Sequence, residues 1–430
     1  MRIKKKKVIL KINGKSARFN LSKHQISFLK DKFNVNDIEE LDDSIIKLLK
    51  SKLMVLTDTR QKKKKKYKIW DIVTCVILAS FSSVESWYEI NDFIVLHYDW
   101  LKVFLKMSGG IPTRQTIERI MSLIDNRELE SILTNFFITI TSLNSNEKDI
   151  INLDGRVDKS SARNKTFYND KANPLNSLNA YSNNYGICLA SEMIDEKTNE
   201  IPTVKEILKR FSIKDVIVTW DALNTQTENV KEVISMNGDY VVPIKGNQGN
   251  FFEDLKLYFD DKKLETIIAG NTKSAYLKIN EKSHSSIITY EYFQTNDVSW
   301  YFDKDKWAGL KTIGLVKKTI ERDKESTTEL RYYISSLNLD IELFSKAIRN
   351  HWSVENKLHW HLDFTFREDD NTTANKNALF NLQLVNKFCL GVLNKVKPFY
   401  NNISLQRIRK IMMASYEEEF INLILYLSLS

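Results

Sequence analysis

Cysteine and long apolar runs are both scarce in this sequence. The three cysteines, Cys75, Cys188 and Cys389, are far apart, and each lies among apolar residues. This pattern predicts reduced core residues and argues against a disulfide framework or a zinc knuckle. The longest apolar runs, "IVTCVILASF" and "INLILYLSLS", are roughly half the ~20 residues that a membrane span needs. The first residues also lack the apolar stretch of a signal peptide. We therefore expect a soluble, intracellular protein without a membrane partner.

Positive charge is in excess and unevenly distributed. The 430 residues include 64 Lys and Arg against 55 Asp and Glu, a net charge of +9. Much of the excess lies in "KKKK" at 4–7 and in "QKKKKKYK" at 61–68, which contains Lys62, Lys63 and Lys64. Such runs favour a polyanionic partner, most often nucleic acid, although a solvated tail or linker has the same composition.

The first half of the chain changes from a helical to a mixed pattern. Residues 1–68 form a basic N-terminal segment, with a helix expected over 43–56. Residues 69–147 carry apolar residues at helical spacing and predict a helical domain, in which "GGIPTRQT" precedes a helix over 115–143. In residues 148–250, short buried strands alternate with amphipathic helices, which indicates an α/β sheet with helices on its faces.

The second half interrupts this alternation and then returns to helices. Residues 251–335 hold β-like pieces at irregular spacing and predict an inserted β-rich subdomain. Residues 336–397 return to helical spacing and include "HWSVENKLHWH" at 351–361. Residues 398–430 are expected to form a C-terminal helix. With 42% apolar residues, the chain can form the cores of two or three domains.

Two aspartates end predicted strands of the α/β region. Asp154 ends "IINLDG" and Asp221 ends "VIVTWDA". Ligand-binding and catalytic groups gather beyond the carboxyl ends of strands in such sheets. Two carboxylates there would make a cleft that hard cations such as Mg²⁺ neutralise. A single strand-terminal aspartate is more often a turn or N-cap residue, so the pair carries the argument.

Glu355 is the third candidate carboxylate, and its helix also raises the question of zinc. On an α-helix His351, Glu355 and His359 would share one face. Eight residues separate the two imidazoles by about 12 Å of helix rise, too far to bind one ion, and the zinc-protease order H-E-x-x-H is absent. We expect the histidines, with Trp352, Leu358 and Trp360, to pack and orient the helix. Three carboxylates around two cations suit phosphoryl transfer.

Several ordered motifs resemble insertion-sequence transposases of the DDE class, in the H-repeat-associated group. The resemblance runs from about residue 53 to 395. The motifs that carry it are "LTDTRQKKKKKYKIWDIV", "GIPTRQTIERIMSLID", "NLDGR", "EKTNEIP", "VTWDALNTQ", "VPIKGNQ", "RYYISSL" and "IRNHWSVENKLHWHLDFTFREDD". Together they are highly specific for this family.

The resemblance implies a catalytic role and a fold. Asp154, Asp221 and Glu355 would be the catalytic, metal-binding triad for two Mg²⁺ ions, which Mn²⁺ could replace. The expected fold is α/β: an RNase H-like α/β/α core with an inserted β-rich subdomain, preceded by a helical N-terminal DNA-binding region. His351 and Leu362 stand where related transposases commonly have arginine and lysine.

The implied partner is double-stranded DNA. The protein would bind the terminal inverted repeats of its element and the target DNA, as a homodimer on DNA in the bacterial cytoplasm and nucleoid. The candidate DNA contacts are Lys62, Lys63, Lys64, Lys245, Asn247, Gln248, Arg349 and His351. A catalytically silent, transposase-derived DNA-binding protein is the main alternative, and a general RNase H-like nuclease without strand transfer is another.

Overall fold

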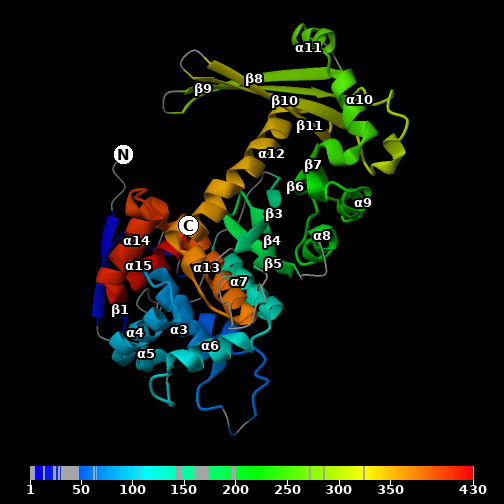
Figure 1. Cartoon of the computed structure of the whole chain (residues 1–430). Coiled ribbons are helices and arrows are strands. Elements are labelled where there is room, and N and C mark those ends of the chain that lie inside the picture. The colour runs from blue at the N-terminus through cyan, green and yellow to red at the C-terminus, as the bar shows by residue number, and fades with distance from the viewer. Residues whose placement is uncertain are drawn as a thin grey trace.

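A nine-stranded sheet runs through the computed structural model (Figure 1). The structure describes residues 5–12, 15–22, 26–27, 30, 48–61, 63, 65–105, 107–141, 148–158, 161, 174–194, 200–270, 273–283, 286–322 and 325–429. The strands lie in the order β5-β4-β3-β6-β7-β11-β10-β9-β8. Their bounds are β3 Ile150–Asp158, β4 Leu175–Ser182, β5 Ile187–Ile194, β6 Ile217–Trp220, β7 Asp239–Ile244, β8 Ser274–Ser283, β9 Ser286–Thr295, β10 Thr312–Arg322 and β11 Glu325–Ser335.

The five strands β3 to β7 lie where the sequence predicts an α/β sheet. β6 is parallel to both β3 and β7, whereas β4 and β5 are antiparallel to their neighbours. Apolar side chains of β3 such as Ile151 and Leu153 face a core shared with helices α8 (Glu200–Leu208) and α9 (Thr227–Ser235). Because side chains alternate along a strand, the residues between them face the opposite side of the sheet.

The β-rich segment continues the same sheet. Its strand β11 is antiparallel to β7, with Ile334 opposite Val242. The expected β-like pieces form β9, β10 and β11, but β8 and the helices α10 (Asn250–Tyr258) and α11 (Asp261–Ile268) were not foreseen. These two helices have only nine and eight residues, so neither offers a long periodic pattern.

Helix α12 (Ile341–Val354) links the β8–β11 part to the helical half of the molecule (Figure 1). Phe344, Ala347 and Ile348 pack on the sheet face that carries Tyr292 and Tyr333. Asp340 caps the helix by accepting a hydrogen bond from the Leu343 N–H. The helix therefore delivers its C-terminal end, and with it Glu355, to a place that the sheet determines.

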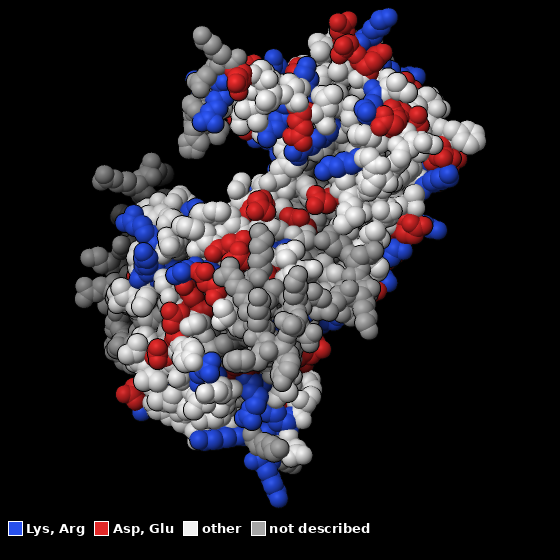
Figure 2. Space-filling view, in the orientation of Figure 1, with Lys and Arg blue, Asp and Glu red and all other residues white. Residues whose placement is uncertain are grey.

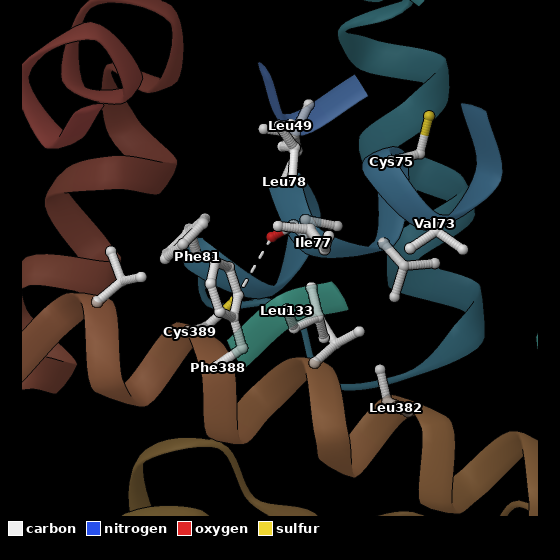
Figure 3. Close-up of a cluster of buried hydrophobic side chains, with 14 of the residues drawn as sticks. Leu49, Val73, Cys75, Ile77, Leu78, Phe81, Leu133, Leu382, Phe388 and Cys389 are labelled. Carbon is white, nitrogen blue, oxygen red and sulfur yellow. Dashed lines mark hydrogen bonds between the residues drawn. The ribbon is translucent and has the colours of Figure 1, made fainter. Parts of the chain in front are cut away.

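Helices from both ends of the chain share one core. The N-terminal members are α3 Ile69–Phe81, α4 Trp87–Leu96, α5 Tyr98–Leu105, α6 Arg114–Ser122 and α7 Asn126–Ile140, and the C-terminal ones are α13 Lys376–Val396, α14 Leu405–Ala414 and α15 Tyr416–Leu429. Figure 3 shows Phe388 and Cys389 of α13 beside Ile77 and Phe81 of α3, with the Cys389 Sγ 3.7 Å from the Ile77 carbonyl oxygen. A hairpin, β1 Lys5–Ile12 and β2 Lys15–Ser22, lies near α15.

Two expected helices are each divided. The helix expected over 115–143 is interrupted at Asp125, whose side chain accepts a hydrogen bond from the Glu128 N–H at 2.9 Å and caps α7. The prediction of a single helix over 398–430 is wrong, because α14 ends before Ser415 and α15 begins after it. The helix expected over 43–56 is present at 48–53, and its first residues, 43–47, lie outside the described part.

All three cysteines are buried free thiols, as the sequence predicts. None of the helices in the described part of the chain combines the length and the apolar character that crossing a membrane requires.

The packing of α12 on the sheet can be tested at Gly314 of β10. A Cβ there would meet the Phe344 ring and would lie 2.8 Å from the Phe293 carbonyl oxygen. Overpacking of this kind costs about 1–3 kcal/mol. Gly314→Ala is therefore expected to lower the free energy of unfolding in urea by that amount. Gly246→Ala, where a Cβ meets nothing within 4 Å, is the control. Equal stability of the two variants would contradict close packing of α12 on β10.

Candidate active site

A row of polar side chains lies on the face of β3 opposite the apolar core. Asn152, Asp154, Arg156 and Asp158 alternate with Ile151, Leu153 and Val157 along the strand. Their partners come from elements across the sheet and from helices: Asn152 donates to Thr219 Oγ1 at 2.9 Å, and Gln383 of α13 donates to Asp158 at 2.8 Å. Buried polar groups are normally paired in this way, and their number on one face of a central strand makes this face the candidate site.

Asp154 and Asp221 are held on neighbouring parallel strands. Leu153 of β3 is opposite Trp220, the last residue of β6, so Asp154 and Asp221 are the residues that come next along the two chains. Asp221 follows the end of β6, as the sequence predicts. Asp154 is not at a strand end, because β3 continues to Asp158 by pairing with β4.

Glu355 begins a π-helical turn rather than continuing α12. The turn spans Glu355–His359, and the Trp360 N–H donates to the Glu355 carbonyl oxygen five residues back. A second π-helical turn, His361–Thr365, follows. Such turns are rare in helices and occur frequently at functional sites. The even α-helical spacing assumed from the sequence is therefore wrong after Val354.

The π-helical turn brings His359 to the carboxylates. His359 Nδ1 lies 3.2 Å from Glu355 Oε2 and 3.6 Å from Asp154 Oδ2. One ligand atom from each of the three residues lies within 4.8 Å of the other two. The His359 side chain is only 7% exposed, whereas that of Glu355 is 69% exposed.

This group suits a divalent cation. Burial, reinforced by the charges of Arg156 and Lys387, lowers the pKa of His359 to about 4, so the ring is neutral near pH 7. Two carboxylates with a neutral imidazole form a donor set that binds divalent metals. His359 is buried, as expected of a residue that packs the helix, and it also contacts both carboxylates.

Asp221 is outside that group and contacts the other histidine. His351 Nε2 lies 3.5 Å from Asp221 Oδ1, and its Nδ1 lies 3.1 Å from Thr219 Oγ1. The hydrogen bond from His351 is the main cause that lowers the pKa of Asp221, and the charges of Lys245 and Arg331 add to it. His351 therefore contacts Asp221, whereas His359 contacts Asp154 and Glu355. This agrees with the prediction that the two histidines do not bind one ion together.

Of the three apolar residues expected to pack this helix, two are packed and one is exposed. Trp352 contacts Tyr290 of β9 at a ring distance of 5.6 Å, and Leu358 is buried in the helical core, as expected. Trp360 was expected to pack as well, but it is 46% exposed and stacks on Phe364, which is also exposed. The π-helical turns rotate Trp360 away from the core.

The predicted DNA contacts near the sheet edge have different surroundings. Lys245 follows β7 and is exposed. Asn247 donates to the Ala222 carbonyl oxygen at 2.8 Å, and Gln248 donates to that of Thr225. These two amides hold the loop after β7 against the loop that follows Asp221, a structural role that the sequence did not reveal.

The remaining predicted contacts lie elsewhere. Arg349 of α12 is paired with Glu281 of β8. In the lysine run, Lys63 is exposed, whereas Lys62 and Lys64 lie outside the described residues.

Two cationic side chains that sequence reasoning missed lie on the sheet beside α12. Lys318 lies over the Tyr290 ring at 5.8 Å, and Arg331 lies over the Trp352 ring at 4.8 Å. Figure 2 shows Lys and Arg side chains along the edge of the β8–β11 part that faces a band of Asp and Glu side chains in the middle of the molecule. The alternating positions in "LVKKTIE" leave open which lysine faces α12, and only the register with β9 decides it.

The chain is similar to transposases over most of its length. Residues 154–390 match the family model described as the transposase DDE domain, and residues 50–137 match the model described as DDE_Tnp_1-associated. The "H repeat-associated putative transposase YhhI" of Escherichia coli (strain K12) is 31% identical over 376 residues, which cover 86% of this chain and 96% of that protein. The "Putative transposase YncI" of Escherichia coli O157:H7 is 28% identical, with 85% and 92% covered.

A solved structure gives a weaker likeness. The chain matches one in the cryo-EM structure of the piggyBac transposase synaptic complex with hairpin DNA at a TM-score of 0.34 and 10% identity, covering 94% of this chain and 80% of that one. A score of this size does not establish a shared fold.

The buried arginine beside Asp154 offers a test of what holds the site together. Arg156 Nη1 and Nη2 contact Glu368 and Asp363, and its side chain is 5% exposed. Removing one partner of a buried ion pair costs about 3–5 kcal/mol. Arg156→Met is therefore expected to lower the free energy of unfolding in urea by that amount. Arg127→Met, which removes an exposed pair with Glu192, should change it by less than about 1 kcal/mol. A stable Arg156→Met protein would show that these contacts do not hold the site.

Proposed function

Because this chain belongs to the transposase DDE domain family, we propose that it is the transposase of a bacterial insertion sequence. It would bind the terminal inverted repeats of its element, cleave DNA there and join the ends to target DNA. The observation that carries the proposal is the meeting of Asp154 and Glu355, distant in sequence, with Asp221 on the adjacent strand.

The strand order supports an RNase H-like core as part of this proposal. β3, β4 and β5 form an antiparallel meander, and β6 and β7 add to β3 in parallel. Residues 148–250 and 336–397 would form this core, with 251–335 inserted between them. Residues 69–147 and the basic segment 1–68 would read the DNA ends, and 398–430 would complete the helical core.

The carboxylates would hold two Mg²⁺ ions, which Mn²⁺ could replace. Bound divalent cations activate the attacking water or 3′-hydroxyl and stabilise the leaving oxygen. Asp154 and Glu355 offer oxygens on one side of the site, and Asp221 offers them from the neighbouring strand. The Asp221 side chain is 63% exposed, so it can rotate toward a ligand, and His351 limits that rotation by its contact with Oδ1.

Cations beside the carboxylates would hold the DNA backbone. Lys245 and Arg331 lie close enough to Asp221 to lower the pKa of its carboxyl group. Lys318 and Arg349 extend this positive surface along the face that α12 covers, where both lie over Tyr290. Phosphate contacts of this kind position a protein on DNA without reading its sequence. Two ends must be joined, so a homodimer on DNA is part of the proposal.

Cleavage can be tested on DNA carrying the inverted repeats that flank the gene. Glu355→Gln and Asp221→Asn are each expected to abolish Mg²⁺-dependent nicking, because an amide replaces a charged ligand oxygen. Folding and DNA binding should persist, since both side chains are exposed. Nicking on a denaturing gel, binding by fluorescence anisotropy and unfolding in urea measure the three properties.

Glu206→Gln, at an exposed carboxylate of α8, is the matched control and should cleave normally. A wild-type protein that binds the repeats but never nicks them would favour the catalytically silent alternative. Cleavage of any duplex or hybrid, without preference for the repeats, would favour a general nuclease.

Salt dependence tests the positive surface. Each phosphate contact contributes about 0.9 to the slope of log affinity against log salt concentration for duplex DNA. Lys318→Gln should therefore weaken binding and reduce the slope by up to that amount. Lys209→Gln, at an exposed lysine directly after α8, should leave the slope unchanged. If both variants behave alike, DNA does not pass over the face of the sheet that carries Lys318.

A further inference from the structure

We propose that His359 is a direct metal ligand, through Nδ1, of the cation that Asp154 and Glu355 hold. This inference rests on the proposed function and extends it, because the triad expected from the sequence contains only carboxylates. The site would then be an asymmetric one, with a nitrogen donor at the first cation position and oxygen donors from Asp221 at the second.

The distances suit coordination of one ion. Ligand atoms at about 2.1 Å from a metal and at right angles to each other lie about 3.0 Å apart. His359 Nδ1 lies 3.2 Å from Glu355 Oε2 and 3.6 Å from Asp154 Oδ2. Small side-chain shifts, of which the exposed Glu355 is capable, would bring all three to adjacent corners of an octahedron.

The surroundings of the ring also favour a ligand over a packing histidine. The His359 side chain is 7% exposed, so its ring is fixed by the atoms around it. Its described polar contacts are both made by Nδ1 and both go to carboxylates. Nδ1, the atom proposed to bind the ion, is therefore the ring atom that faces both carboxylates.

Backbone geometry places His359 there. Glu355 and His359 are the first and last residues of one π-helical turn, and Asp154 faces them from β3. His361, two residues further on, has its Nδ1 3.0 Å from Thr365 Oγ1 instead. The neighbouring histidine of the same segment therefore provides a matched control.

Mn²⁺ binding to the full-length protein gives a readout that is independent of activity. Electron spin-echo measurements detect a nitrogen that is bonded to Mn²⁺, and they distinguish ¹⁴N from ¹⁵N. We expect the wild-type signal to contain an imidazole coupling that changes when the histidines are ¹⁵N-labelled. His359→Phe should abolish this coupling and weaken Mn²⁺ binding about tenfold or more, and His361→Phe should change neither.

The preference between metals gives a second measurement. Nitrogen donors favour Mn²⁺ and Co²⁺ over Mg²⁺ more than carboxylates alone do. His359→Phe should therefore reduce the ratio of Mn²⁺ to Mg²⁺ affinity in calorimetric titrations, and His361→Phe should leave it unchanged.

The outcomes separate this inference from the proposed function. Mn²⁺ that binds in an Asp154-dependent way but shows no imidazole coupling, or a coupling that persists in His359→Phe, overturns the role of His359 and leaves the carboxylate site intact. Absence of Mn²⁺ binding, or binding that Asp154→Asn does not weaken, overturns both. The isotope comparison uses the wild-type protein, so absence of an imidazole coupling would overturn the role of His359 even if His359→Phe failed to fold.

Discussion

The buried contacts of Arg156 with Asp363 and Glu368 are the constraint on which the site depends. They join the central strand β3 to the segment that follows Glu355, and Glu368 in turn accepts a hydrogen bond from Asn386 of α13. A charge this deeply buried is tolerated only with paired partners, so the strand, the π-helical segment and α13 must adopt one relative position. Asp154 lies two residues before Arg156 on the same face of β3. The distance from Asp154 to Glu355 and His359 is therefore set by an ion pair next to the site.

The two π-helical turns allow one segment of the chain to contact both Arg156 and Asp154 on β3. Asp363 must reach Arg156 while Glu355 and His359 both reach toward Asp154. In a regular α-helix, residues 355 and 363 are separated by about 12 Å of rise. The i→i+5 turns shorten and widen the segment, so that both functions fit along one strand. Exposure of Trp360 follows from the same change in twist.

The local sequence pattern predicts strands β3 and β6 and the two aspartates that follow their apolar runs. It does not predict the cluster that Asp154 forms with Glu355 and His359. Strands β3 and β6 are short apolar runs bounded by turn signals, so their parallel pairing and the adjacency of Asp154 and Asp221 could be foreseen. Glu355 could be named as a candidate third carboxylate from its helix, and the family resemblance assigned it to the triad. The contact of His359 with Asp154 was not foreseen, because the spacing of His359 was judged only against His351 on an ideal α-helix, whereas Asp154 lies on a distant strand. The cationic face that includes Lys318 was missed because strand register, which depends on long-range pairing, decides which side chain faces α12.

The continuous sheet also explains how opposite charges can be held at fixed separations. β3, β6 and β7 are parallel. Asp154 lies within β3, Asp221 and Lys245 directly follow β6 and β7, and Arg331 of β11 is next to Lys245. Neighbouring strands are about 4.8 Å apart, so Asp154 on β3 and Lys245 after β7, two strands away, are separated by roughly 10 Å across the sheet. Backbone hydrogen bonds, rather than flexible side-chain contacts, set this spacing. A phosphate bound by the cations would place the next part of the same DNA strand over the carboxylates, and the sheet would hold that alignment without any motion of the β-rich segment.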